Sequence, residues 1–207
     1  MTEFLVGFLL LFPLFMLAVT VHELSHGLVA LYFGDPTARQ AGRLTLNPLK
    51  HIDPMGTLLL PLLLRLIHSP LLFGWAKPVP INALNLRHPR QDILWVGAAG
   101  PAANFLLAAV VALGLKLFGG LFPLLLTELA RYLILINLVL GTFNLLPIPP
   151  LDGSRILMGI LPARFSWILA LLERWGILLV LLMLSLGLGD RVLDPVVTTL
   201  ARWLGVG

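Results

Sequence analysis

The chain has 207 residues, of which 58% are hydrophobic and only 12% are charged. An ordinary soluble domain contains about 25% charged residues, so this composition excludes a soluble domain and indicates a membrane protein that contacts the lipid bilayer. The formal net charge of +4 comes mostly from basic residues between the apolar runs. That pattern is typical of cytoplasmic loops, so it gives no reason to expect binding to nucleic acid.

The apolar runs lack the period-two alternation of a β-barrel, so we expect helices. The predicted fold class is an all-α polytopic membrane protein with about four transmembrane helices, a re-entrant or interfacial segment and a short membrane-dipping β element. Runs of roughly 20 apolar residues are long enough to cross a bilayer. The four predicted spans are residues 4–33, 92–118, 123–146 and 165–188. We expect them to form a core, residues 1–189, followed by an interfacial C-terminal tail, residues 190–207.

Two basic stretches lie between the first two predicted spans and flank a further apolar run, residues 54–75. A single crossing by this run would place the basic stretches on opposite sides of the membrane, against the positive-inside tendency. Two prolines and an arginine also interrupt the run, and irregular backbone is tolerated at membrane depth where it lines a protein cavity. We therefore favour a re-entrant or interfacial segment. The sequences "GRLTL" at 42–46 and "PVPI" at 78–81 are interpreted as short strands.

The first span contains the sequence His-Glu-Leu-Ser-His at residues 22–26. Positions four apart lie on one face of a helix, so His22 and His26 can occupy two corners of a zinc tetrahedron. Glu23 then lies beside the metal, where it can deprotonate a zinc-bound water. The alternative is a pair of histidines that only pack helices through hydrogen bonds to neighbouring carbonyls. That alternative leaves the costly intramembrane Glu23 unexplained.

A catalytic zinc usually has three protein ligands, and the absence of cysteine restricts them to histidine and carboxylate. We predict Asp152 as the third ligand. Three prolines between residues 147 and 150 must end the preceding helix, which leaves Asp152 on an extended segment with no basic neighbour closer than Arg155. Aspartate is also a favoured N-cap, and the two roles are compatible. The other histidines, His51, His68 and His88, are expected to be structural or solvated.

Three segments together resemble the signature segments of the site-2 protease family, the intramembrane zinc metalloproteases. They are "HELSH" at 22–26, "GPAANF" at 100–105 and "NLLPIPPLDG" at 144–153. The similarity extends over residues 4–160 and includes the stretches "GRLTLNPLKHIDPMG" and "WAKPVPIN" seen in compact bacterial members. Like those members, the sequence shows neither a PDZ-like nor a CBS-like insert.

The resemblance implies one Zn²⁺ per chain, bound by His22, His26 and Asp152, with Glu23 as the catalytic base. It also implies that two asparagines help to hold the substrate backbone near the metal. They are Asn104 and Asn144. From the residues alone, hydrogen bonds that bridge neighbouring spans are an equally good interpretation of both asparagines.

The implied activity is hydrolysis of a peptide bond within or near the transmembrane segment of a single-span membrane protein. The implied location is the cell (inner) membrane, with the active site opening toward the cytoplasmic side. Two alternatives are a catalytically silent metal-binding membrane scaffold and an ion or metal transporter. A scaffold has little use for Glu23. A transporter usually shows inverted repeats or polar groups in several spans, and the sequence shows neither.

Overall fold

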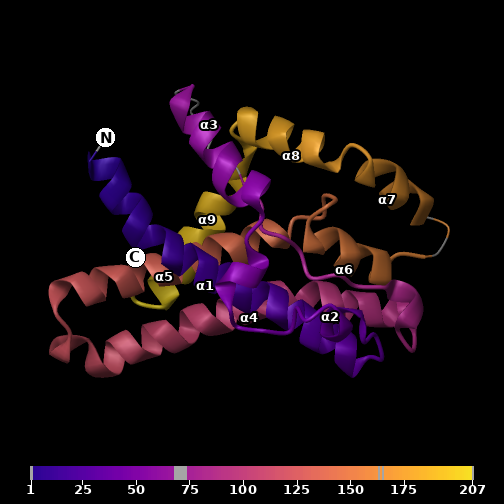
Figure 1. The fold of residues 1–207 in the computed structure, drawn as a ribbon, viewed down its shortest axis with the longest axis horizontal. Coiled ribbons are helices and arrows are strands. Elements are labelled where there is room, and N and C mark those ends of the chain that lie inside the picture. The colour runs from indigo at the N-terminus through magenta and orange to yellow at the C-terminus, as the bar shows by residue number, and fades with distance from the viewer. Residues whose placement is uncertain (1, 68–73, 163, 165, 207) are drawn as a thin grey trace.

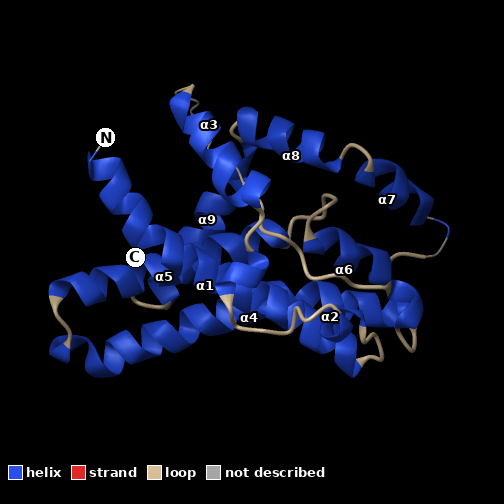
Figure 2. Cartoon of the chain, viewed as in Figure 1, coloured by secondary structure: helices blue, strands red, loops and turns tan. Residues whose placement is uncertain are grey.

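The structure, a computed structural model, describes residues 2–67, 74–162, 164 and 166–206. Within these residues the chain is helical and has no strand (Figure 2). The α-helices are α1 (Thr2–Tyr32), α2 (Thr37–Gln40), α3 (Leu60–Leu66), α4 (Pro89–Phe118), α5 (Leu124–Asn144), α6 (Asp152–Ile160), α7 (Ser166–Glu173), α8 (Gly176–Ser185) and α9 (Leu188–Trp203). Short 3₁₀ or π-helical turns cover Pro48–His51, Pro54–Leu59, Ala83–Asn85 and Gly119–Leu121.

Three helices, α1, α4 and α5, are long and apolar enough to cross a membrane. They correspond to the first three predicted spans. Helix α4 lies at the centre of the fold, where it contacts α1, α5 and α6 (Figure 1). Its start is well defined, because Pro89 occupies the first turn and the Asp92 carboxylate accepts a hydrogen bond of 2.7 Å from the backbone amide of His88.

The run predicted as the fourth span, residues 165–188, is not one helix. It forms α7 and α8, which have 8 and 10 residues and are separated by a turn at Arg174 and Trp175. Neither helix reaches the roughly 20 residues that a single crossing requires. A close contact lies at the interruption: Gly176, the first residue of α8, packs directly against the backbone of Pro149, where an added Cβ would lie 2.4 Å from the carbonyl oxygen.

Helix α9 contains most of the predicted tail, residues 190–207, and packs onto the hairpin of α4 and α5. Its Val197 and Ala201 are buried in a cluster with apolar side chains of both helices. The other buried members of the cluster are Ala108, Ala112, Ile134 and Leu138. The division into a core and an interfacial tail stays a prediction.

The two ends of the apolar run 54–75 lie side by side. The amide of Trp75 donates to the carbonyl of Gly56 at 3.2 Å, and the Thr57 hydroxyl donates to the carbonyl of Trp75 at 2.8 Å. The run therefore leaves and returns to the same place, as the re-entrant or interfacial interpretation requires. Residues 68–73, which include His68, lie outside the described part of the chain.

The strands predicted at 42–46 and 78–81 are not formed, and this expectation was wrong. Both segments are extended or irregular, and no backbone ladder joins them in the described residues. Pro78 and Pro80 have no amide hydrogen to donate to a ladder. The guanidinium of Arg43 instead bridges the two segments by donating to the carbonyl of Lys77 at 2.7 Å.

The C-terminal end of α1 is fastened to the start of α4 through a buried carboxylate. Asp35 accepts hydrogen bonds from the amide and hydroxyl of Thr37, from the amide of Asn82 at 2.7 Å and from the side chain of Asn85 at 2.9 Å. Next to it, the amide of Arg87 donates to the carbonyl of Phe33 at 2.9 Å. These contacts place the end of α1 and the start of α4 on the same side of the molecule.

Candidate metal centre

Helix α1 presents His22 and His26 on one face, one turn apart. Their ring centroids are 4.6 Å apart with the planes nearly perpendicular, at 82°. The two residues are 7% and 2% exposed. Gly100 on α4 makes this burial possible, since an added Cβ there would lie 2.4 Å from Nε2 of His26 and 2.6 Å from Nε2 of His22. Gly100 thus allows the close approach of α4 to α1 at this point.

Asp152, the first residue of α6, brings a carboxylate oxygen to the two rings. Its Oδ2 lies 3.0 Å from Nε2 of His22 and 3.1 Å from Nε2 of His26, and the two Nε2 atoms are 3.0 Å apart. The other oxygen, Oδ1, accepts from the guanidinium of Arg155 at 3.3 Å. The structure thus brings together all three predicted ligands in one buried cluster.

The hydrogen bonds on the far side of each ring fix which nitrogen carries the proton. Nδ1 of His26 lies 2.6 Å from the carbonyl oxygen of Val96, which can only accept, so Nδ1 is the protonated nitrogen. Nδ1 of His22 lies 2.6 Å from Oδ1 of Asn104, an amide oxygen that likewise accepts. In the neutral imidazoles both Nε2 atoms therefore carry lone pairs directed at the carboxylate and at each other.

Three lone-pair-bearing atoms within about 3 Å of one another repel unless a positive charge lies among them. One proton can be shared by only two of the three atoms, whereas a single metal ion satisfies all three. A tetrahedral zinc with bonds of about 2.0 Å has ligand atoms about 3.3 Å apart, close to the spacing of this cluster. Two imidazoles and one carboxylate, each held by a further hydrogen bond, fit a catalytic zinc with one open position.

Glu23 is not part of the ligand cluster. Its Oε2 accepts a hydrogen bond of 2.7 Å from the backbone amide of Val79, in the segment that precedes α4. Among the described residues no hydrogen bond reaches Oε1. The carboxylate is only partly buried. It therefore has one fixed oxygen and one oxygen available to a water molecule.

The two predicted substrate-binding asparagines lie in different surroundings. Asn104 is fully buried, and its amide nitrogen donates to the carbonyl of Ala18 at 3.2 Å and to Oδ1 of Asn137 at 2.7 Å. These contacts match the alternative interpretation, a bridge between helices, and they add a contact to His22. Asn144, at the end of α5, is partly buried, and among the described residues its side chain donates to the carbonyl of Leu140 at 3.0 Å and to no other group. Substrate binding by either residue stays a prediction.

Sequence reasoning missed three groups that orient the site: the carbonyl of Val96, the amide of Val79 and the side chain of Asn137. Asn137 could have been found from the sequence, because an asparagine within an apolar span needs polar partners. Main-chain groups carry no such signal.

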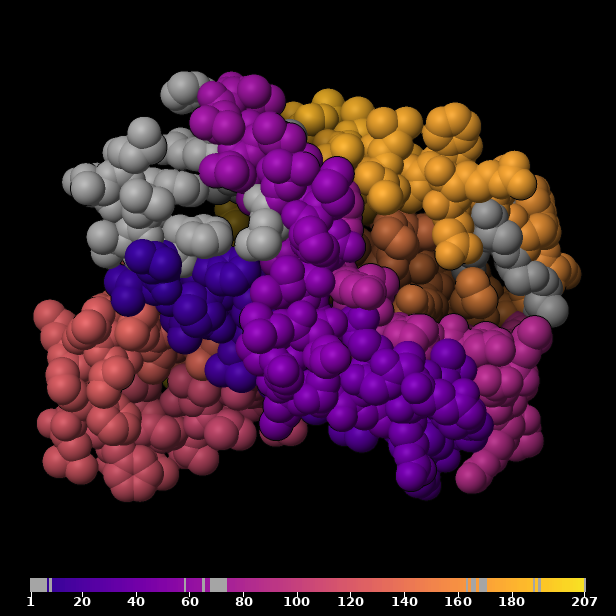
Figure 3. Space-filling view, viewed as in Figure 1, coloured from indigo at the N-terminus to yellow at the C-terminus, as the bar shows by residue number. Residues whose placement is uncertain are grey.

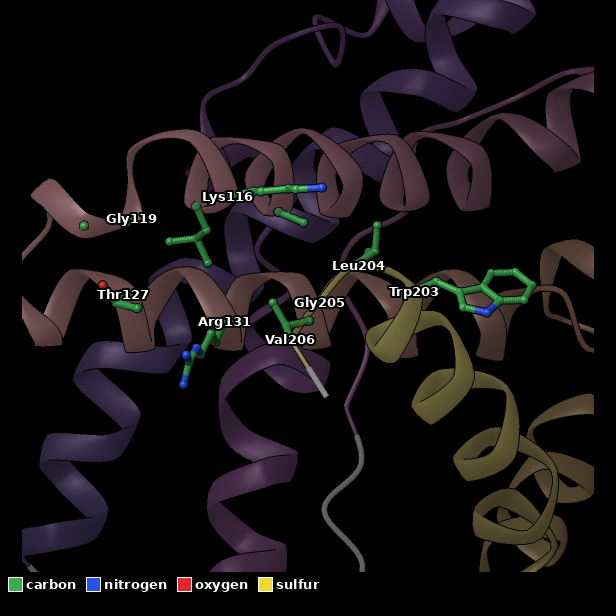
Figure 4. Close-up of a pocket in the computed structure, with 11 residues that line it drawn as sticks. Lys116, Gly119, Thr127, Arg131, Trp203, Leu204, Gly205 and Val206 are labelled. Carbon is green, nitrogen blue, oxygen red and sulfur yellow. The ribbon is translucent and has the colours of Figure 1, made fainter.

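A separate pocket of about 480 Å³ lies where α4 ends and α5 begins (Figure 4). Its lining includes Lys116, Thr127 and Arg131 from these helices, together with Trp203 and the residues after it. None of the residues discussed as metal ligands lines this pocket. Among the described residues, the one group of candidate metal ligands is therefore the cluster between α1 and α6.

This arrangement is that of a membrane-embedded zinc metallopeptidase. Two histidines lie one turn apart on a membrane-length helix, an acid lies between them in sequence, and an aspartate reaches them from another helix. Comparisons with known proteins agree. Residues 119–187 match the profile of peptidase family M50. YwhC of Bacillus subtilis (strain 168), named as a candidate zinc metalloprotease, is 40% identical over 85% of this chain and 80% of that protein.

Two further relatives carry similar names. Rip2 of Mycolicibacterium smegmatis, also named as a candidate zinc metalloprotease, is 34% identical over 86% of this chain and 67% of that protein. A zinc metalloprotease of Methanocaldococcus jannaschii is 28% identical over 94% of this chain and 48% of that protein. No solved structure matches the chain at a significant level. The chain belongs to peptidase family M50, the site-2 protease family.

Proposed function

We propose that the chain is an intramembrane zinc endopeptidase that hydrolyses a peptide bond within or near the transmembrane segment of a single-span membrane protein. One observation carries the proposal: three lone-pair atoms of His22, His26 and Asp152 meet within 3.1 Å beside a membrane-length helix. Glu23 supplies a carboxylate next to them in sequence that is not used as a ligand.

His22, His26 and Asp152 would hold one zinc ion per chain. When bound, zinc acts as a Lewis acid that polarises the substrate carbonyl and makes water more acidic. Glu23 takes the proton of the attacking water at Oε1, since Oε2 is engaged by the Val79 amide. Glu23 then returns that proton to the leaving amine.

The surrounding residues orient these groups and the peptide. Asn104 and the carbonyl of Val96 hold the two imidazoles with Nε2 unprotonated. We assign the predicted substrate contact to Asn144, whose Oδ1 accepts no hydrogen bond from the described residues, and a positioning role to Asn104. The substrate helix must unwind locally, because the carbonyls of an intact helix are already hydrogen-bonded.

We place the protein in the cell membrane with the site opening toward the cytoplasm. The basic residues of the connection between α1 and α4 favour this orientation, because such residues concentrate in cytoplasmic loops. Arg39, Arg43, Lys50, Lys77 and Arg87 flank the apolar run 54–75, and Arg90 follows in the first turn of α4. Contacts between Phe33 and Arg87 and between Gly56 and Trp75 support a single side for the whole connection.

The test is cleavage of a panel of single-span substrates in liposomes, with bound zinc measured in every sample. Glu23→Gln should retain zinc and lose cleavage, since the amide cannot take a proton. Glu128→Gln, which alters an exposed glutamate paired with Arg131 at the far end of α5, is the matched control and should cleave normally. Equal cleavage by Glu23→Gln and wild type would contradict the proposed base. A wild-type chain without zinc would contradict the metal centre.

A further inference from the structure

The segment before α4, residues 76–81, lies against the helix that carries the metal-binding motif; we call it the strap. Its centre is Val79, whose amide donates to Oε2 of Glu23 at 2.7 Å and whose side chain is buried. Gly27, directly after His26, allows this approach, because an added Cβ would lie 3.1 Å from Cγ1 of Val79 and 2.5 Å from Cδ2 of Leu44.

The strap is held on both sides at Lys77. The Lys77 amide donates to the carbonyl of His51 at 2.9 Å, and its carbonyl accepts from Nη2 of Arg43 at 2.7 Å. The same Nη2 lies 3.4 Å from the carbonyl of Pro78. Prolines at two of its positions have no amide hydrogen to donate, which weakens pairing with a neighbouring strand. The carbonyls of Lys77 and Pro78 accept from the Arg43 guanidinium instead.

Burying the Arg43 guanidinium costs free energy, which its hydrogen bonds must offset. It is only 8% exposed, and no carboxylate lies within ion-pair distance of it in the described residues. A buried guanidinium without an acidic partner is unfavourable unless its hydrogen bonds are satisfied. Its Nε has no hydrogen-bond partner among the described residues, and the hydrogen bonds that its side chain does make there, through Nη2, all end on the strap.

The loop that carries Arg43 is itself fixed from within. The ring of His51 is fully buried and lies 3.1 Å from the carbonyl of Thr45 through Nε2. In Figure 3 the purple surface of this part of the α1–α4 connection occupies the middle of the visible face. Contacts thus run without a break from the loop, through Arg43 and Lys77, to Val79 and Glu23.

We propose that Arg43 is a positioning residue for Glu23. It fixes the strap so that the Val79 amide always engages Oε2 and leaves Oε1 to the attacking water. The proposal rests on the proposed function, in which Glu23 is the base. If the strap were a lid instead, it would have to leave Glu23 before a substrate could react. A positioning strap predicts that loosening it slows turnover, whereas a lid predicts that loosening it speeds turnover.

The experiment compares Arg43→Gln, Arg43→Lys and the control Arg39→Gln, which removes an exposed arginine of α2 in the same connection. Cleavage of a single-span substrate gives kcat and KM, zinc content is measured in parallel, and hydrogen exchange reports the Val79 amide without any substrate. For Arg43→Gln we expect kcat to fall about 10-fold to 100-fold, as for loss of a buried charge-assisted hydrogen bond, with KM and zinc nearly unchanged. Exchange at Val79 should become about 10-fold faster, and Arg43→Lys should be intermediate.

Val79→Pro removes the donated hydrogen and retains an apolar side chain, so it should reduce kcat as Arg43→Gln does. Combining the two changes should add little, because both act through one hydrogen bond. Unchanged or faster cleavage by Arg43→Gln, or unchanged exchange at Val79, would overturn the proposal. If wild type and Arg39→Gln cut no substrate, the proposed function fails, and the exchange measurement still decides whether Arg43 holds the strap.

Discussion

The carboxamide oxygen of Asn104 lies 2.6 Å from Nδ1 of His22, and the two side chains join α4 to α1 inside the protein. Asn137 and the carbonyl of Ala18 take the amide hydrogens of Asn104, so its oxygen must face the histidine. This arrangement determines the tautomer of His22 and hence the availability of its Nε2 for a metal. The polar groups of three helices are therefore coupled to one ligand atom.

Asn104→Ala should weaken zinc binding while leaving a folded chain. Loss of a hydrogen bond to a metal-binding histidine typically costs about 10-fold to 100-fold in metal affinity, which competition with a chromophoric chelator can measure. Asn144→Ala is the control, since that side chain donates a hydrogen bond to the Leu140 carbonyl and makes none to the histidines, and it should leave zinc affinity unchanged and raise KM. Equal zinc affinity in wild type and Asn104→Ala would leave the asparagine with no role at the metal.

Gly100→Ala should disrupt the metal centre. The added methyl group would lie within 2.6 Å of ring atoms of both histidines, so the rings or α4 must move. We expect loss of bound zinc and of cleavage, together with destabilisation of about 1–3 kcal/mol from overpacking. Gly114→Ala on the same helix is a matched control, because its Cβ would meet nothing within 4 Å. Bound zinc and thermal unfolding measured in both variants test the contact.

The local pattern of the sequence predicted the part of the site that depends on helix geometry. The spacing of His22 and His26 and the proline-broken segment before Asp152 predicted that these three side chains meet, and the structure brings them together. The break between α7 and α8 was not predicted. It lies where Gly176 meets the backbone of Pro149, and the local sequence pattern does not reveal such a contact between distant parts of the chain. The prediction of strands at 42–46 and 78–81 was wrong for a similar reason. The Arg43 side chain, and not a backbone ladder, joins the two segments.

The stability of the α1–α4 junction should depend on pH through Asp35. Burial tends to raise the pKa of Asp35, but hydrogen bonds from the side chains of Thr37 and Asn85 and from the amides of Asn82 and Thr37 outweigh burial and hold that pKa below 3.8. A carboxylate whose pKa is lower in the folded state stabilises the fold above its unfolded pKa, and the stabilisation is lost as the pH falls through the folded pKa.

Asp35→Asn should therefore be less stable than wild type at pH 7, by about 1–3 kcal/mol, because the new amide faces donors. The difference should shrink as the pH falls below 3.8. Thermal unfolding in detergent between pH 7 and pH 3 measures both effects, with Asp194→Asn on α9 as the control for loss of one exposed acid. A constant difference across this range would remove the role assigned to ionised Asp35.

Metal removal should destabilise the fold, because chelation leaves the three ligand atoms facing one another without a cation. An ion at 100 times its Kd contributes about 2.7 kcal/mol, which corresponds to a fall in Tm of roughly 5–10 °C for a chain of this size. Asp152→Asn should respond much less to the chelator, since it lacks the charged ligand. An identical Tm with and without chelator in the wild-type chain would argue against a metal at this site.

The chain segments before and after the apolar run 54–75 should be accessible from the same face of the membrane. The chain has no cysteine, so single cysteines at Lys50, Arg87 and Gly120, all exposed, can be labelled in sealed vesicles without background. Contacts of Trp75 with Gly56 and of Arg87 with Phe33 require Lys50→Cys and Arg87→Cys to react from the same side. Gly120→Cys, in the turn beyond α4, should react from the opposite side, because α4 is long enough to cross. Labelling of positions 50 and 87 from opposite sides would mean that the run crosses the membrane once, and the hydrogen-bonded return at Trp75 could not then exist in the bilayer.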